Sequence, residues 1–182
     1  MPKPLLVSFL GGADGPWIVE RMTAVTGTAL PIVERLRVVE GDQVVASASG
    51  WCLRGVASNE RYVERPERTL LVERQRPLAR DEATCAALIP ISKSVAWWEL
   101  TQDERRTVLE ERSRHIAVGL EYLPAVARRL HHGRDLGEAF DFLTWFEYPP
   151  EASADFEDLV ERLRGTEEWR YVEHEMDIRL RR

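Results

Sequence analysis

The sequence predicts an α+β fold of the ferredoxin-like type, in which split β-α-β units build one sheet with helices packed on it. From residue 51 onward the predicted order is strand, helix, strand, helix, strand, helix, strand. The connections between these strands are long enough to hold helices, as split β-α-β units require. Residues 1–50 show only shorter strand patterns, so we expect a truncated strand-rich part over 1–50 packed on a ferredoxin-like domain over 51–182.

The first part is divided by glycine-containing turns. Residues 5–10 form an apolar run that ends at Gly11-Gly12, which indicates a strand. Residues 17–26 are ambiguous between helix and strand. Residues 36–39 and 44–48 flank the turn sequence Glu40-Gly41-Asp42, so a hairpin is expected there.

The second part opens with a strand, a helix and another strand. Residues 51–58 alternate in the way that is typical of a strand. Pro66 suits the first turn of a helix, which continues over residues 68–76. Residues 83–91 form a continuous apolar run, as expected for a strand that is buried on both faces.

A long helical segment begins at Thr101. This threonine suits the N-cap position, and Glu104 three residues later completes a capping box. Pro124 lies too deep in the segment to start it, so it should end or kink the helix. The apolar residues that recur at roughly helical spacing are Val108, Leu109, Ile116 and Leu120.

Beyond Pro124 we expect a second helix over residues 125–132, which stops at Gly133. A strand over residues 140–148 follows. The remaining elements are a helix over 156–164 capped by Ser153 or Asp155, a turn or short helix over 166–169, and a strand over 171–180.

Composition narrows the class of protein. The 182 residues carry a net charge of −6 without a basic block, which argues against nucleic acid or an anionic membrane as a partner. Cys52 and Cys85 have no metal-ligand spacing and read as buried free thiols in a reducing compartment. No segment has the length of a membrane span or the pattern of a secretory signal, so a cytoplasmic location is expected.

Residues 97–148 hold the candidate chemistry. In one straight helix His115 and Arg128 would lie about 20 Å apart, whereas a bend at Pro124 would let Arg128 face a group that His115 holds. A histidine ligand needs an acceptor on its other ring nitrogen, and Glu168 is a candidate. Arg128 is permanently charged and suits a small anion. A lone helical histidine is, however, more often a surface or core residue than a ligand.

The aromatic residues allow two interpretations. Trp97, Trp98, Trp145 and Phe146 are candidate walls for a flat hydrophobic cofactor, but composition alone favours an ordinary core. His131 and His132 would point about 100° apart in a helix, which makes a poor ligand pair. His174 reads as structural or exposed. The sequence contains no glycine-rich phosphate loop, H-E-x-x-H motif or nucleophile elbow.

Several long motifs, in order, resemble the chlorite dismutase family and its short-chain members. They are WCLRGVASNERY, ALIPISKSVAWWE, HIAVGLEYLPAVARRL, DFLTWFEY and GTEEWRYVE. The resemblance covers nearly the whole chain and is weakest over residues 1–50. It implies a dimeric α+β barrel of ferredoxin-like fold, a homodimer that carries one haem b per chain.

The resemblance also implies roles for single residues. His115 in HIAVGLEYLP is similar to the proximal haem ligand, and Glu168 in TEEW to its hydrogen-bond partner. Arg128 in PAVARRL is similar to a mobile distal arginine, with Gln75 in VERQ beside it. The positions that line the haem or meet its propionates are matched by Ile89, Lys93, Trp97, Asn59 and Tyr62.

The reaction implied is the conversion of chlorite to chloride and molecular oxygen. One O–Cl bond of chlorite breaks at ferric haem, Arg128 retains the hypochlorite-level fragment, and the O–O bond then forms. The alternatives are peroxidase or coproporphyrin-haem decarboxylase activity in the same superfamily, and non-catalytic haem binding or sensing. The decarboxylases often lack the distal arginine, so the presence of Arg128 favours the chlorite reaction over decarboxylation.

Overall fold

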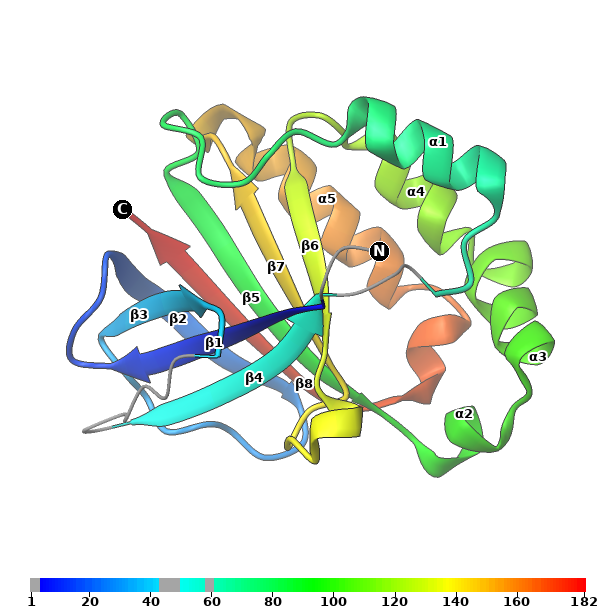
Figure 1. The fold of residues 1–182 in the computed structure, drawn as a ribbon, viewed down its shortest axis with the longest axis horizontal. Coiled ribbons are helices and arrows are strands. Elements are labelled where there is room, and N and C mark those ends of the chain that lie inside the picture. The colour runs from blue at the N-terminus through cyan, green and yellow to red at the C-terminus, as the bar shows by residue number, and fades with distance from the viewer. Residues whose placement is uncertain (1–3, 43–49, 58–60) are drawn as a thin grey trace.

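A closed barrel of eight antiparallel strands forms the centre of the computed structural model, which describes residues 4–42, 50–57 and 61–182 (Figure 1). Around the barrel the strands follow the order β1-β3-β2-β8-β5-β7-β6-β4. Their bounds are β1 Leu5–Gly12, β2 Trp17–Thr26, β3 Arg35–Glu40, β4 Trp51–Ala57, β5 Cys85–Lys93, β6 Ala127–His132, β7 Phe142–Tyr148 and β8 Val172–Arg181.

The helices gather on one side of the barrel, next to β5, β6 and β7 (Figure 1). α4 contacts both α1 and α5, so the three helices form one layer over this part of the sheet. The α-helices are α1 Arg65–Arg74, α2 Val95–Glu99, α3 Gln102–Arg106, α4 His115–Glu121 and α5 Ser153–Arg164. A π-helix, η1 Thr107–Arg112, joins α3 to the turn before α4, and short 3-10 helices are η2 Arg134–Leu136, η3 Pro150–Ala152 and η4 Glu168–Tyr171.

Opposite faces of the same strands build two cores. Inward-facing residues of β5 such as Leu88 fill the barrel, whereas Ile89 and its outward-facing neighbours pack under α5. Side chains alternate between the faces of a strand, so a strand covered on both faces is apolar throughout. This confirms the prediction for the run 83–91. The aromatic residues of the core inside the barrel are Phe9, Trp17, Trp51, Phe140 and Trp145, and those of the second core are Phe142, Phe146, Tyr148 and Phe156 of α5.

Strands from residues 1–50 belong to the same barrel as the rest of the chain. β1 pairs with β3 and β4, and β2 pairs with β8 from Ile18 opposite Arg181 to Thr26 opposite Glu175. The ambiguous segment 17–26 is therefore a strand. The second arm of the expected hairpin, residues 44–48, lies outside the described residues. The division of the chain at residue 50 stays a prediction.

The prediction of a helix over residues 125–132 is wrong, because these residues form β6. β6 pairs with β7 at six successive positions, from Ala127 opposite Glu147 to His132 opposite Phe142. Its Ala-Arg-Arg-Leu sequence favours a helix locally, but pairing with the neighbouring strand decides the outcome. His131 and His132 consequently point to opposite faces of the sheet instead of lying 100° apart on a helix.

The other predicted elements agree with the structure in type and differ at their ends. The capping box of Thr101 and Glu104 is present at α3, and α4 ends at Glu121, before Pro124, which follows a cis peptide bond. α5 starts at Ser153 with Ala152 at the N-cap, so neither Ser153 nor Asp155 is the cap. The Ser153 hydroxyl instead donates to the carbonyl of Pro150 in the preceding 3-10 turn. The strands predicted over 51–58, 83–91, 140–148 and 171–180 are β4, β5, β7 and β8.

Both cysteines are free, as expected, and half-buried. Burial raises the pKa of the Cys52 and Cys85 thiols. Among the helices of the described residues, none combines the length and the apolar character needed to cross a membrane.

Candidate active site between the helices and the sheet

His115 is the first residue of α4, and the neighbouring residues Arg114 and Glu110 fix the start of this helix. Arg114 before it adopts a left-handed backbone conformation with φ of 54°, which turns the chain from η1 into α4. The carboxylate of Glu110 then accepts hydrogen bonds from the backbone N–H groups of Ile116 at 2.6 Å and Ala117 at 3.2 Å. These bonds satisfy free donors at the start of the helix. The His115 side chain therefore projects from a capped helix terminus.

Glu168 joins His115 to a buried lysine. Its Oε2 lies 2.6 Å from Nδ1 of His115, and its Oε1 accepts a hydrogen bond from Nζ of Lys93 at 2.7 Å. Its backbone N–H donates to the Ser113 hydroxyl at 2.9 Å. Glu168 and Lys93 are only 3% and 4% exposed, so this ion pair is removed from solvent.

The charge state of Glu168 follows from its neighbours. Burial alone would raise the pKa of this carboxyl, but His115 and Lys93 outweigh it and lower the pKa to about 2. The ionised carboxylate can only accept, so Nδ1 of His115 carries the proton in this bond. When the ring is neutral, its lone pair therefore lies on Nε2, the nitrogen that is left to bind a metal.

The sheet opposite α4 presents a largely apolar face. Because β6, β7 and β5 are neighbours in register, Leu130, Thr144 and Ile89 form one outward-facing row across the three strands. Leu130 is 42% exposed, which is unusual for an apolar residue in the middle of a sheet. The flanking rows are Arg128, Phe146 and Ala87 on one side and His132, Phe142 and Ile91 on the other.

Arg128 is a half-buried residue whose charged group is enclosed by the protein. Desolvation by burial lowers the pKa of its guanidinium to about 10. Nη1 donates to the carbonyl of Gly119 at 2.9 Å, and no carboxylate pairs with Arg128 among the described residues. Gly119 lies one helical turn after His115, so β6 places this cation beside the helix that carries the histidine.

Lys93 and Trp97 lie close to this histidine-carboxylate pair. The Lys93 ammonium lies 4.6 Å from the centre of the Trp97 ring and donates to Glu168. Trp97 is 1% exposed, and no described residue accepts a hydrogen bond from its indole Nε1. Tyr62 meets the Trp97 ring edge-on at 6.3 Å, and Nη1 of Arg105 donates to the Tyr62 hydroxyl at 3.4 Å.

The remaining sequence candidates are placed differently. Gln75 is half-buried at the end of α1, where its side-chain amide donates to the carbonyl of Arg76, and no hydrogen bond joins it to Arg128 in the described part of the chain. Asn59 lies outside the described residues. Trp145 faces the barrel interior and is a core residue, while Trp98 stacks on Phe142 with ring centres 5.9 Å apart.

Sequence reasoning missed Leu130, Thr144 and Gly119 as parts of the site. The alternation of β6 would have revealed Leu130 on the same face as Arg128, but the segment was interpreted as a helix. Gly119 has a close-approach role, because a Cβ at this position would overlap the Arg128 guanidinium. No local pattern indicates that contact, since the two residues meet only after α4 folds over β6.

The chain is similar in sequence and fold to known proteins. A family model described as Chlorite dismutase matches residues 18–180. The chain belongs to the chlorite dismutase family. A dimeric chlorite dismutase from Nitrobacter winogradskyi is 55% identical, with a TM-score of 0.90 over 97% of this chain and 99% of that chain. Membership of this family makes the protein an enzyme, and its ferredoxin-like α+β fold agrees with the predicted class.

More distant chlorite dismutases share the fold. A mutant chlorite dismutase from Candidatus Nitrospira defluvii is 20% identical, with a TM-score of 0.72 over 98% of this chain and 92% of that chain. The curated chlorite dismutase of Ideonella dechloratans is 38% identical over 69 residues. That match spans 38% of this chain but only 23% of the curated relative.

Proposed function

We propose that the protein is a haem b chlorite dismutase that converts chlorite to chloride and molecular oxygen. The observation that carries the proposal is the Lys93–Glu168–His115 series, which leaves one histidine nitrogen free on the helix that contacts Arg128, a cation with no carboxylate partner among the described residues. The likeness to the dimeric enzyme of Nitrobacter winogradskyi supports the same activity, one haem per chain and a homodimer. We further propose that it acts in the cytoplasm.

The residues present fit a haem in three respects. Nε2 of His115 would be available to bind the haem iron, because Nδ1 is held by Glu168. The row of Leu130, Thr144 and Ile89 offers a mostly apolar surface to a flat ring. The buried indole N–H of Trp97 donates to no acceptor in the described part of the chain, and it suits an acceptor such as a propionate.

The haem iron supplies the redox chemistry when it is bound. Glu168 accepts a hydrogen bond from the Nδ1–H group of His115, which would make the ring a stronger ligand and favour ferric haem. Lys93 keeps Glu168 ionised, and the burial of both groups excludes water from this side of the site. Each of these residues acts on the ligand and none touches chlorite.

Arg128 is the group that we assign to the substrate. Chlorite is a small monoanion, and a partly desolvated guanidinium without a carboxylate partner binds such an anion by charge-assisted hydrogen bonds. Its present hydrogen bond to the Gly119 carbonyl is to a neutral acceptor, so an anion would compete well for it. When an O–Cl bond breaks, Arg128 retains the hypochlorite fragment until chloride and O2 are formed.

The test is to load the purified chain with ferric haem, add chlorite, and record oxygen release, chloride release and the haem spectrum together. We expect one O2 and one chloride per chlorite consumed. The apo-protein and free haem at the same concentration are the controls. Haem-dependent oxidation of dyes by peroxide without O2 release from chlorite would replace this proposal with the peroxidase alternative, and decarboxylation of coproporphyrin haem would replace it with the decarboxylase alternative.

A further inference from the structure

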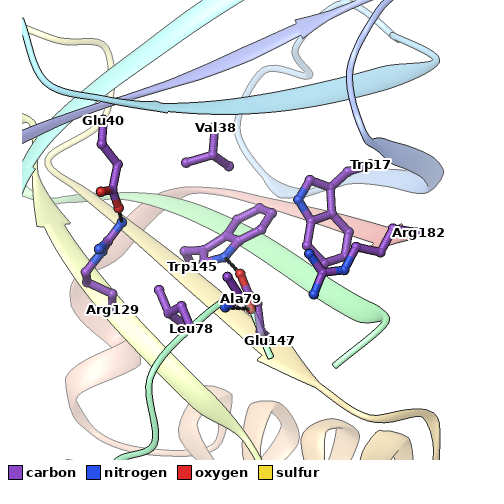
Figure 2. Close-up of a pocket in the computed structure, with 9 residues that line it drawn as sticks. All are labelled: Trp17, Val38, Glu40, Leu78, Ala79, Arg129, Trp145, Glu147 and Arg182. Carbon is purple, nitrogen blue, oxygen red and sulfur yellow. Dashed lines mark hydrogen bonds and ion pairs between the residues drawn. The ribbon is translucent and has the colours of Figure 1, made fainter. Parts of the chain in front are cut away.

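A cavity of about 210 Å³ lies on the barrel-interior face of the sheet, opposite to the face that carries Arg128. The side chains that line it come from β2, β3, β6 and β7, from the segment before β5 and from Arg182 after β8 (Figure 2). Arg129 lines it, whereas the adjacent Arg128 belongs to the opposite face of β6. A ligand in this cavity would therefore be separated from the candidate haem site by the sheet itself.

Glu147 places a buried carboxylate in this cavity. The residue is 5% exposed, and its Oε1 accepts a hydrogen bond from the indole N–H of Trp145 at 2.8 Å. Its Oε2 accepts one from the backbone N–H of Ala79 at 2.6 Å. Both donors are neutral, and over residues 4–42, 50–57 and 61–182 no basic group forms an ion pair with Glu147. An uncompensated buried anion is costly, and each oxygen can accept a further hydrogen bond.

The walls around Glu147 are suited to a cation. Two indoles, Trp17 and Trp145, line the cavity together with Val38 and Leu78. The guanidinium of Arg182 already lies 4.7 Å from the centre of the Trp17 ring, so this aromatic face accepts positive charge. Two arginines line the cavity: Arg129 pairs with the Glu40 carboxylate at 2.6 Å, and Arg182 donates to the carbonyl of Arg80 at 2.7 Å.

The rim of the cavity is held in an uncommon backbone conformation. Ala79 has a φ of 62°, in the left-handed region that residues other than glycine rarely adopt. Its N–H is the group that donates to Glu147, so the carboxylate stabilises this conformation. Such conformations cluster at binding sites, where the surrounding structure maintains them.

We propose that this cavity binds a small organic monocation, a primary ammonium or guanidinium compound with a short apolar body. Glu147 is the counter-ion, and Trp17 and Trp145 contact the apolar body. The volume equals that of about seven water molecules at about 30 Å³ each, which sets the upper size of the ligand. The site is independent of chlorite chemistry, since its residues face the barrel interior.

Benzylammonium is a suitable probe, with benzyl alcohol and benzoate as the neutral and anionic controls. Each compound is titrated into the haem-loaded protein and followed by isothermal calorimetry. We expect one benzylammonium per chain and much weaker binding of both controls. Glu147→Gln keeps the size and one acceptor oxygen, and should weaken benzylammonium at least about tenfold, as expected for the loss of a hydrogen bond to a charged group.

A second variant keeps the test valid if Glu147→Gln alters the fold. Val38→Phe fills the cavity from a half-buried position on β3 and leaves the carboxylate in place. It should abolish benzylammonium binding while the unfolding midpoint changes little. The proposal is overturned if the wild-type protein does not bind benzylammonium, if benzyl alcohol binds equally well, or if a folded Glu147→Gln or Val38→Phe variant binds as the wild type does.

Discussion

At the scale of single residues, the Glu168 carboxylate decides which nitrogen of His115 is free. It lies between Lys93 and His115, and both partners lower its pKa to about 2 against the effect of burial. A carboxylate that stays ionised keeps the proton of the imidazole on Nδ1 at all ordinary pH values. The sequence suggested Glu168 as the partner of His115, and the structure places the two in contact. In the structure the Lys93 ammonium donates a hydrogen bond to Glu168. The expected role of Lys93 at the haem or its propionates stays a prediction.

The first prediction concerns His115 as the axial ligand. His115→Ala removes the only ring nitrogen that Glu168 orients, so we expect the protein to lose haem or to hold it weakly with a changed spectrum. His174→Ala is a matched control, because His174 is half-buried on β8 and its Nε2 contacts the carbonyl of Thr28 instead. Full haem content and an unchanged spectrum in the His115 variant would rule out this ligand.

The second prediction concerns Arg128 as the retaining group. Arg128→Ala should still bind haem and turn over chlorite, but more slowly and for fewer turnovers before the haem bleaches. Loss of a charged hydrogen bond of roughly 1.5–3 kcal/mol shifts the partition between retention and escape of hypochlorite about 10- to 100-fold. The measurement is the O2 yield per haem, with and without methionine as a hypochlorite scavenger.

Arg129→Ala is the control for this prediction, because it removes the same charge from the opposite face of β6. It should leave the O2 yield and the scavenger effect unchanged. If Arg128→Ala shows the wild-type yield and no benefit from methionine, another residue retains the fragment.

At the scale of elements, the site depends on the contact between α4 and β6. Gly119 lets the Arg128 guanidinium approach the helix backbone, where a Cβ would overlap it. Gly119→Ala should therefore displace Arg128 and lower the O2 yield in the same direction as Arg128→Ala, while haem stays bound. Gly165→Ala is the control, since a Cβ there lies no closer than 3.5 Å to its neighbours. An unchanged yield in the Gly119 variant would contradict this account of the contact.

The two histidines of β6 should make the stability of the folded protein depend on pH. Burial lowers the pKa of His131 and of His132 to about 4, from an ordinary value of 6.5. Between those pH values the unfolded chain binds protons that the folded chain does not, so stability present above pH 6.5 is lost as the pH falls towards 4. Each imidazole contributes at most about 1.4 kcal/mol per pH unit in that window.

Urea unfolding midpoints measured above and below pH 6.5 test this effect. The comparison is made between pH 6.5 and 5, because Glu168, whose ordinary pKa is 4.5, binds a proton in the unfolded chain at lower pH and adds its own loss of stability there. His131→Gln should remove about half of the pH dependence, since its amide retains a donor for the Leu143 carbonyl that lies 3.0 Å from Nδ1 of His131. A stability that is flat between pH 6.5 and 5 would contradict the lowered pKa of these imidazoles.

β6 is the strand that sequence patterns did not predict. The strands β4, β5, β7 and β8, the buried run 83–91 and the capping box at Thr101 depend on local patterns, and the structure confirms them, whereas the predicted order lacked β6. The segment 127–132 has a helical composition but pairs with β7, and only tertiary pairing decides between the two. The sequence therefore did not predict that Arg128 and Leu130 share the outward face of β6.

At the scale of the whole molecule, the barrel separates two sites on opposite faces of one sheet, and the proposed homodimer is the next level of organisation. The likeness to a dimeric chlorite dismutase that is 55% identical leads us to expect two chains with one haem each. Size-exclusion chromatography with light scattering should give twice the 20.9 kDa of one chain. A monomer or a pentamer at micromolar concentration would contradict this expectation.

The measurement that tests the proposed function most directly is the origin of the two oxygen atoms in O2. Chlorite labelled on both oxygens with the heavy isotope is added to the haem-loaded protein in unlabelled water, and the released gas is analysed by mass spectrometry. If Arg128 retains the fragment until the O–O bond forms, the O2 carries two labels. Oxygen that carries one label or none, or chlorite loss without O2, would contradict the proposed reaction.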